Sequence, residues 1–305
     1  MIRRPPRSTQ GVSSAASDVY KRQTYEPEIT PEQILEKIEN FEVIIVRSRT
    51  KITKDMIEKA NKCQIIARVG VGLDNIDQAA AKEKNIRVIN AVEGAMNAVA
   101  ELVIGLMLSL AREIPRADRE VRNGNWIKKE LMGTELRGKY LGIVGLGNIG
   151  KRLGRLARAL NMNIIGYDVV PIDEEFSSEV GLMKADLGTL LASSDYVSLH
   201  VPLLDSTKHL INAEKMSTMK NTSRIINTSR GGVIDEDALY EFLKDGKLGG
   251  AALDVFEVEP ATSNKLASLP NFISTPHMGA QTKEAQSLAA NVIAEKIIQI
   301  LRGVT

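Results

Sequence analysis

The sequence predicts an α/β protein built from two doubly wound parallel sheets. Short apolar segments of strand length alternate with segments of helical periodicity, both before and after a long apolar helix. This alternation implies parallel strands joined by right-handed crossovers. The 305 residues, 43% of them hydrophobic, suffice for two domains with separate cores. We therefore expect two domains with a cleft between them.

The first sheet is predicted from the segment that begins at Thr30, where Thr30 and Pro31 form a typical helix start. Three largely apolar segments follow, and their continuous apolar character indicates strands buried on both faces. The stretches between them are long enough for short helices. Strands are expected at 43–46, 64–69 and 86–89, and helices at 54–61 and 77–85.

The second sheet is predicted beyond a helix at residues 97–112, an amphipathic segment at 116–123 and a glycine-flanked stretch at 124–138. These segments form a candidate hinge and interface arm. The alternation of strands and helices then starts again. Strands are expected at 140–145, 163–168, 196–199, 224–227, 250–255 and 272–274, and helices at 148–160, 236–244 and 285–301.

Composition excludes several classes of protein. The net charge is only +2 and the basic excess lies in the first 23 residues, so the rest of the chain lacks the basic surface that nucleic acids and anionic membranes require. Cys63 is the only cysteine, which excludes an intrachain disulfide and indicates a reducing compartment, the cytoplasm. The apolar stretch 102–111 is shorter than the roughly 20 residues that span a bilayer. We expect no nucleic acid, membrane or metal partner.

Residues 1–23 are rich in Arg, Ser, Pro and Ala and have no periodic apolar face. This composition predicts a disordered segment and excludes a signal peptide. The segment also resembles a translated sequencing adapter, so we expect it to be non-native.

A glycine loop follows the first strand of the second half, where residues 140–150 have the sequence YLGIVGLGNIG. Gly145 allows a tight turn, Gly147 lets a pyrophosphate approach the backbone, and Gly150 allows close packing of the helix on the strand. The phosphates are expected at the helix N-terminus, where unpaired amides and the helix dipole favour anions. The loop therefore predicts a dinucleotide site.

Asp168 ends the next strand, 18 residues beyond Gly150. A carboxylate at this position binds the ribose hydroxyls of adenosine in dinucleotide-binding domains. Val169, Val170 and Pro171 follow it, so no neighbouring arginine neutralises a 2′-phosphate. We therefore predict NAD rather than NADP; the alternative is an ordinary glycine turn followed by a surface aspartate.

Three segments of the second half place charged residues in loops that follow apolar strands, and these residues are Arg230, Glu259 and His277. In a doubly wound sheet such loops meet at the carboxyl edge, where ligands bind. Histidine exchanges protons readily near neutral pH, and the arginine fork matches a carboxylate. Singly, each residue also fits a structural role as a turn residue, a solvated acid or a surface charge.

The glycine loop and these segments, with RSRT at Arg47, RVGVGLDNID at Arg68 and HMGAQTKEAQ at His277, resemble the D-isomer-specific 2-hydroxyacid dehydrogenase family. The resemblance covers about residues 31–303 and is nearest to the branch that oxidises D-3-phosphoglycerate. It implies a flavodoxin-like substrate domain and a Rossmann NAD-binding domain that carries the interface arm of a homodimer. The corresponding domain bounds are 25–92 plus 283–305, and 93–282.

The resemblance also implies the roles of individual residues. His277 is the expected acid/base, Glu259 is its partner, and Arg230 binds the substrate carboxylate and polarises the C2 oxygen. Arg47 and Arg68 are positioned to bind a substrate phosphate, with surface salt bridges as the alternative. The implied substrate contacts are Arg47, Arg68, Val71, Gly72 and Arg230. The implied cofactor contacts are Gly145, Gly147, Asn148, Ile149, Gly150, Asp168, His200, Pro202, Thr207, Thr228 and Asp254.

Two of these cofactor assignments have structural alternatives. His200 is equally consistent with a purely structural hydrogen bond, and Asp254 with a buried helix cap. Relatives also open with a strand and a helix before Thr30, so the substrate domain is expected to lack both. No segment beyond the last helix is expected to form a regulatory serine-binding module.

The expected reaction is therefore the NAD-dependent oxidation of D-3-phosphoglycerate to 3-phosphohydroxypyruvate, a step of serine biosynthesis. A glyoxylate or hydroxypyruvate reductase of the same family is the alternative enzyme, because it uses the same three residues on a substrate without phosphate. An NAD-sensing corepressor, which shares this scaffold but acts by binding peptides, is an alternative of another class.

Overall fold

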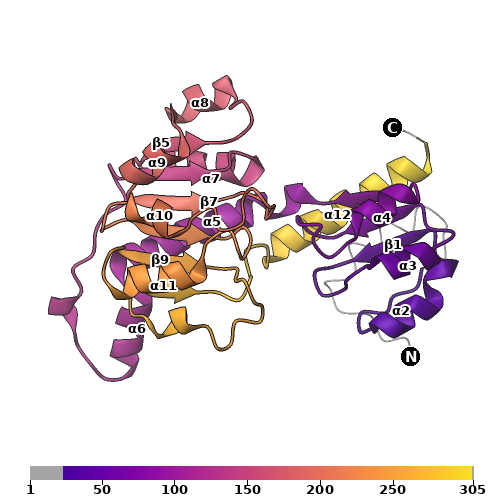
Figure 1. The fold of residues 1–305 in the computed structure, drawn as a ribbon, viewed down its shortest axis with the longest axis horizontal. Helices are drawn as coiled ribbons and strands as arrows, with labels where there is room; N and C mark the ends of the chain where they lie inside the picture. Colours follow the sequence, from indigo (N-terminus) through magenta and orange to yellow (C-terminus); the bar gives the residue numbers. More distant parts are fainter. Residues whose placement is uncertain (1–22, 304–305) are drawn as a thin grey trace. The chain divides into compact units, whose positions relative to one another are not determined.

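The computed structural model describes residues 23–303, so the expectation for residues 1–23 lies, apart from Gln23, outside the described part. The described chain forms two compact units, residues 23–96 with 280–303 and residues 97–279 (Figure 1). The smaller unit contains a parallel sheet of 3 strands and the larger unit a parallel sheet of 7 strands. The α/β fold class is confirmed.

In the smaller unit the sheet order is β1-β2-β3, and all three strands are aligned so that Val46, Arg68 and Asn90 lie side by side at their carboxyl ends. The strand predictions for this unit are confirmed to within one residue. Its elements are α2 (Pro31–Lys37), a 3-10 helix (Ile38–Asn40), β1 (Val43–Val46), α3 (Lys54–Lys59), β2 (Ile65–Arg68), α4 (Gln78–Glu83), β3 (Arg87–Asn90), the first turn of α5 (Val92–Arg112) and α12 (Lys283–Leu301).

Helices cover both faces of this sheet. Ile66 packs with the buried side chains of α2, α3 and α4, whereas its neighbours Ile65 and Ala67 pack with Ala289 and Ile293 of α12. Because successive side chains of a strand point to opposite faces, a continuous apolar strand supplies both cores. The central strand is therefore almost wholly apolar, as predicted.

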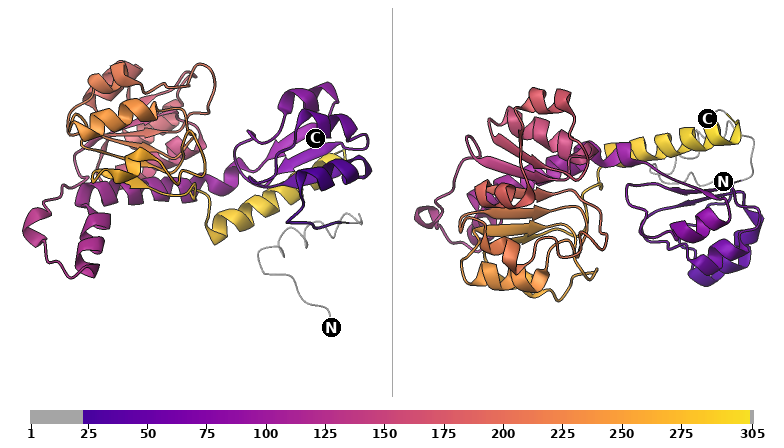
Figure 2. Two further views of the ribbon diagram at one scale, coloured as in Figure 1. Left: turned by 60° about the horizontal axis from the view of Figure 1, so that its bottom comes forward. Right: turned by 45° about the horizontal axis from the view of Figure 1, so that its top comes forward.

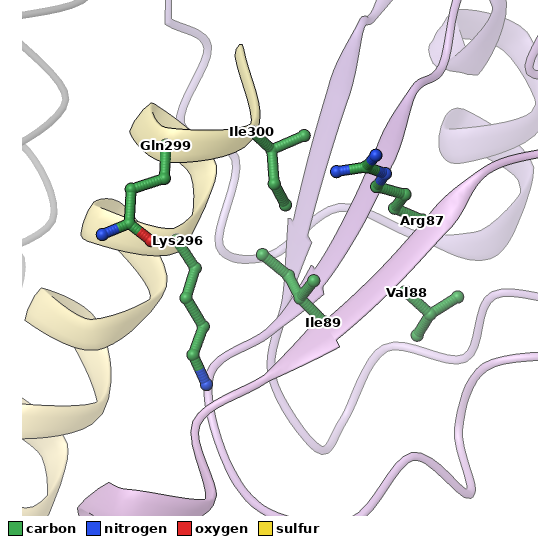
Figure 3. Close-up of a pocket in the computed structure, with 6 residues that line it drawn as sticks. All are labelled: Arg87, Val88, Ile89, Lys296, Gln299 and Ile300. Atoms are coloured by element: carbon green, nitrogen blue, oxygen red, sulfur yellow. The ribbon is translucent and has the colours of Figure 1, made fainter. Parts of the chain in front are cut away.

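Gly94 allows α5 and α12 to approach closely. A Cβ atom at Gly94 would lie 2.8 Å from the Cβ of Ala289 and 3.0 Å from the carbonyl oxygen of Ala285. A few turns further along α12, Lys296 Nζ donates to Asn90 O and to the Glu93 carboxylate. A pocket of about 390 Å³ lies between β3 and α12, where the side chains of Ile89 and Ile300 face each other (Figure 3).

In the larger unit the strand order is β10-β9-β8-β7-β4-β5-β6, so the order reverses between β4 and β7. Ligands of such sheets bind beyond the carboxyl ends of the strands at this reversal. Its elements are most of α5, α6 (Ile114–Arg122), a 3-10 helix (Lys128–Glu130), β4 (Tyr140–Val144), α7 (Asn148–Ala159), β5 (Asn163–Tyr167), α8 (Glu174–Val180), β6 (Met183–Lys184), α9 (Leu187–Ser193), β7 (Tyr196–Leu199), α10 (Ala213–Ser217), β8 (Arg224–Asn227), α11 (Glu236–Lys244), β9 (Gly250–Leu253), a 3-10 helix (Lys265–Ser268) and β10 (Phe272–Ser274).

The two faces of this sheet carry different helices. Ile143 packs in a core with α5, α7 and α8, and the next residue, Val144, packs in a core with α9, α10 and α11. Figure 2 shows α5 along one face of the sheet and the orange helices of the C-terminal half on the other. Helices α8 to α10 and the two-residue strand β6 were not predicted individually.

The helix α5 corrects two expectations. It begins at Val92 rather than at residue 97, because its first turn is stabilised by packing on α12 rather than by a periodic sequence signal. It is also 21 residues long and apolar enough in composition to span a membrane, unlike the ten-residue stretch from which a span was excluded. More than half of the most apolar part of this helix is buried inside the protein, which is typical of a core helix.

Candidate active site at the carboxyl edge of the larger sheet

The glycine loop lies at the point where the strand order reverses. Gly145 has φ of +95°, and a Cβ atom there would lie 2.7 Å from the carbonyl oxygen of His200, which follows β7. A Cβ atom at Gly150 would lie 2.1 Å from Gly145 O. Gly147 is the N-cap of the 12-residue helix α7, and the space beside it is open. The loop therefore offers the helix amides that a pyrophosphate binds, beginning with those of Asn148 and Ile149.

Asp168 follows β5 and its carboxylate reaches back to the glycine loop. Oδ2 accepts a hydrogen bond from the amide of Leu146 at 2.6 Å, and Oδ1 accepts one from the amide of Val170 at 3.1 Å. Val169 and Val170 are exposed and supply no positive charge. A negative carboxylate in this place favours ribose hydroxyls, which donate hydrogen bonds, over a phosphate.

Polar groups on the neighbouring strand ends complete the predicted cofactor site. Thr207 Oγ1 donates to Pro202 O at 2.6 Å and accepts from Leu204 N, so Thr207 folds the loop after β7. The hydroxyl of Thr228, after β8, is buried without a hydrogen-bond partner among the described residues. Because a buried hydroxyl normally has a partner, this atom and the glycine cradle fit a dinucleotide.

His200 is hydrogen bonded through Nε2 to the Ser198 hydroxyl at 2.9 Å. Burial lowers the pKa of His200 to about 4, so the ring is neutral at physiological pH. The structure thus supports the structural alternative for the side chain, while the His200 backbone lies against Gly145. Its contact with a cofactor stays a prediction.

His277 and Glu259 form a hydrogen-bonded pair. His277 Nδ1 lies 2.9 Å from Glu259 Oε2, and Glu259 Oε1 accepts from the amide of Phe256 at 3.1 Å. His277 is half exposed and has φ of +52°, a conformation uncommon outside glycine and asparagine. The carboxylate is fixed by the backbone on one side and orients the imidazole on the other.

Arg230 is held by a tight turn after β8. The buried Asn227 donates from Nδ2 to Arg230 O at 2.8 Å, and its Oδ1 accepts from the amide and hydroxyl of Ser229. Arg230 Nη1 donates to Ser229 O at 2.6 Å. Asn227 was not singled out from the sequence, although a buried amide side chain at the end of an apolar strand is a usable signal.

Asp254, at the end of β9, anchors the segment that carries His277. Its fully buried carboxylate accepts from Thr275 Oγ1 at 2.5 Å, from Met278 N at 2.9 Å and from Gly279 N at 2.9 Å. These donors flank His277 on both sides. Asp254 therefore does not act as the cap of the following helix α12, which was the alternative role; that cap is Thr282. A contact of Asp254 with the cofactor stays a prediction.

The three predicted catalytic residues lie beyond adjacent strands. Arg230 follows β8, Glu259 follows β9 and His277 follows β10, and these strands are neighbours in the sheet. Parallel strands bring their carboxyl ends to one edge, which explains how residues almost 50 positions apart are gathered. The edge therefore carries a hydrogen-bonded imidazole–carboxylate pair and a guanidinium group.

The predicted substrate residues of the smaller unit also lie at strand ends. Arg47 follows β1 and is exposed, and its carbonyl accepts from Asn75 Nδ2 at 3.0 Å. Arg68 ends β2, and its guanidinium lies over Gly70, where a Cβ atom would be 2.9 Å from Nη1. Val71 O accepts from Asn90 Nδ2, which fixes the turn before Gly72.

A second pocket, of about 460 Å³, lies beside the loop that carries Glu259. His209 lines it and pairs with Glu257, with His209 Nε2 3.0 Å from Glu257 Oε1. The pocket between β3 and α12 contains none of the predicted site residues. No cluster of metal-ligating side chains is present within residues 23–303.

Comparison with known proteins gives a family match over most of the larger unit. The family described as D-isomer specific 2-hydroxyacid dehydrogenase, NAD binding domain, matches residues 104–279. The chain is 49% identical over 276 residues to the D-3-phosphoglycerate dehydrogenase of Methanocaldococcus jannaschii, an alignment that covers 90% of this chain and 52% of that protein. The chain therefore spans about half the length of this relative.

Two further proteins match over most of both chains. The hydroxypyruvate reductase of Thermotoga maritima is 48% identical over 273 residues, which are 88% of each chain. The crystal structure of Rhodotorula graminis D-mandelate dehydrogenase has a TM-score of 0.88 and 31% identity, and the alignment covers 97% of this chain and 92% of that one.

Proposed function

This chain belongs to the D-isomer-specific 2-hydroxyacid dehydrogenase family, and on that premise we propose that it oxidises D-3-phosphoglycerate to 3-phosphohydroxypyruvate. Residues 104–279 are an NAD-binding domain of this family. The observation that carries the proposal is the His277–Glu259 pair beside the strand end of Arg230. Such a reaction would belong to serine biosynthesis.

The geometry supports a proposed role for each of these side chains. Because His277 Nδ1 faces Glu259, Nε2 is the ring nitrogen that accepts the proton of the substrate C2 hydroxyl. Glu259 stabilises the imidazolium that results, and Arg230 binds the carboxylate through its planar fork. The glycine loop and Asp168 would hold NAD, which when bound would supply the acceptor for the hydride of C2.

Two side chains support a phosphorylated substrate. Arg68 is the last residue of β2 and is aligned with Val46, the residue before Arg47 on the adjacent strand β1. Arginine is the usual residue for binding phosphate oxygens. The relative from Methanocaldococcus jannaschii is named as a phosphoglycerate enzyme. Hydroxypyruvate reduction is the second candidate, because a relative that matches over most of its length carries that name.

The test is a comparison of steady-state kinetics. The protein is assayed with 3-phosphoglycerate and NAD, and with NADH and phosphohydroxypyruvate, hydroxypyruvate or glyoxylate. The highest kcat/KM for the phosphorylated pair is expected. A preference for hydroxypyruvate or glyoxylate would replace the first candidate with the second, and no turnover of any of the four would refute both.

We also propose that a second copy of the chain covers the arm formed by α6 and residues 124–138. Val121, Trp126 and Met132 are large apolar side chains on this arm and are strongly exposed; Trp126 is 82% and Met132 86% exposed. Exposed apolar side chains in such number are typical of interfaces. Light scattering is expected to give a dimer mass, and replacement of Trp126 and Met132 by serine to yield monomers.

A further inference from the structure

The loop that carries Glu259 is fastened at two places by one carboxylate. We name residues 255–264 the glutamate loop. Glu236, in the first turn of α11, accepts from the amide of Glu257 through Oε1 at 2.6 Å and from Asn264 Nδ2 through Oε2 at 2.6 Å. The two donors lie on either side of Glu259. Glu236 thus bridges the base of the loop that orients the acid/base.

The link to the start of the loop is reciprocal. The amide of Glu236 donates to Glu257 Oε1 at 3.4 Å, while the amide of Glu257 donates to Glu236. Glu257 Oε1 also faces His209 Nε2. Two backbone segments joined in both directions have little freedom to move apart.

The other end of the loop is anchored in the core. Asn264 Oδ1 accepts from the amide of Leu266, and Leu266 is fully buried. Glu236 therefore ties Glu259 to a rigid part of the molecule. Burial raises the pKa of Glu236 and the neighbouring charges of Glu257 and Asp237 add to the rise, while the hydrogen bonds from the Glu257 amide and from Asn264 oppose it.

We propose that Glu236 is a positioning residue for catalysis, which holds Glu259 in the orientation that pairs with His277. The inference rests on the proposed dehydrogenase function and goes beyond it. Glu236 belongs to the same connection as Arg230, six residues earlier, so it also couples the substrate-binding segment after β8 to the loop after β9.

Two variants disrupt the hydrogen bond between Glu236 and Asn264 while the helix caps formed by Asp235 and by residue 264 are kept. Asn264→Asp keeps the oxygen that accepts from Leu266 but places a carboxylate against Glu236. Glu236→Gln turns one acceptor into a donor, which meets the Asn264 amide donor. Each is expected to lower kcat about tenfold with the Kd of NAD unchanged, since displacement of a catalytic group by about 1 Å can cost on the order of 100-fold. The double variant Glu236→Gln/Asn264→Asp restores a donor facing an acceptor and is expected to recover most of the loss.

The matched control is Asp237→Asn, which removes the same charge from the same helical turn. Asp237 is 88% exposed and forms an ion pair with Lys265, so the kcat of this variant is expected to stay at the parental level. In a Glu259→Gln background, Glu236→Gln is expected to cause no further loss, because interacting residues are not additive. A purely structural role would instead lower stability in every background and leave kcat intact.

A second measurement does not need turnover. Hydrogen exchange of the Phe256 amide, which donates to Glu259, reports whether the Glu259 carboxylate keeps this hydrogen bond. Faster exchange in Asn264→Asp and protection restored in the double variant are expected. Parental kcat in both single variants, or unchanged Phe256 exchange, overturns the inference. If the parent protein turns over none of the four substrates, the proposed function falls, and the exchange measurement still decides the role of Glu236.

Discussion

The carboxyl edges of the two sheets differ in how their polar residues are held. On the larger sheet, the segments after β8, β9 and β10 are fixed by the buried side chains of Asn227 and Asp254 and by the partly buried Glu236. On the smaller sheet, Asn75 and Asn90 fix the backbone of the turns, but Arg47 itself is exposed.

This difference follows from the two tasks proposed for the edges. Proton transfer requires a near-attack geometry, and buried hydrogen bonds keep the transferring groups in place. A phosphate is large and highly charged, and a long arginine binds it with less demand on backbone precision. Substrate choice can therefore vary at the edge of the smaller sheet without disturbing the chemistry proposed for the edge of the larger sheet.

The largest effect on kcat is expected at the carboxyl edge of the larger sheet. His277→Ala should lower kcat by on the order of 100- to 10,000-fold, the contribution of a positioned acid/base, while NAD still binds. Stopped-flow or steady-state assays give kcat, and fluorescence titration gives the Kd of NAD. Near-normal turnover would remove His277 from the mechanism, and Lys283→Ala, a change at the start of α12, serves as the control.

At the edge of the smaller sheet, Arg47→Ala and Arg68→Ala should distinguish a phosphorylated substrate from one without phosphate. Each is expected to weaken the use of phosphohydroxypyruvate by about 1.5 to 3 kcal/mol, the range for a hydrogen bond to a charged group. Hydroxypyruvate lacks the phosphate and should be affected much less. Because both substrates report on the same variant, damage to the fold cancels; equal losses would show that the arginines only support the domain.

A smaller effect, on cofactor preference, is expected at Asp168 on the edge of the larger sheet. Asp168→Ala removes the carboxylate that disfavours a 2′-phosphate, and the preference for NAD over NADP should fall about tenfold, as expected for a charge-assisted hydrogen bond to the ribose. The ratio of kcat/KM for the two cofactors measures it. An unchanged ratio contradicts the ribose assignment.

The last prediction concerns stability in acid rather than activity. Since burial lowers the pKa of His200 from 6.5 to about 4, the unfolded chain takes up this proton first, and stability falls as the pH drops from about 6.5 towards 4. Urea unfolding without NAD at pH 7 and pH 5 should show a loss of about 1 to 2 kcal/mol that His200→Gln does not share. Equal losses in both proteins would contradict a buried neutral histidine.

The sequence predicted the strands more accurately than the helices. Largely apolar runs such as Val43–Val46 and Tyr196–Leu199 were located correctly, because short apolar runs are typical of the strands of parallel sheets. The start of α5 was missed by five residues, since its first turn contains Gly94 and depends on packing against α12. Helices α8 to α10 are short, and short helices carry a weak periodic signal.

The chemistry of the site was predictable where it depends on local residue order. The sequence alone located the glycine loop and Asp168 at strand ends and placed Arg230, Glu259 and His277 in loops that follow strands, because each belongs to a short motif after an apolar run. Only the tertiary structure decided what holds them. Asp254 anchors residues more than 20 positions away, and Glu236 binds Asn264 28 positions away. These hydrogen bonds form only after the parallel strands bring distant loops to one edge of the sheet. A local sequence pattern therefore cannot predict them.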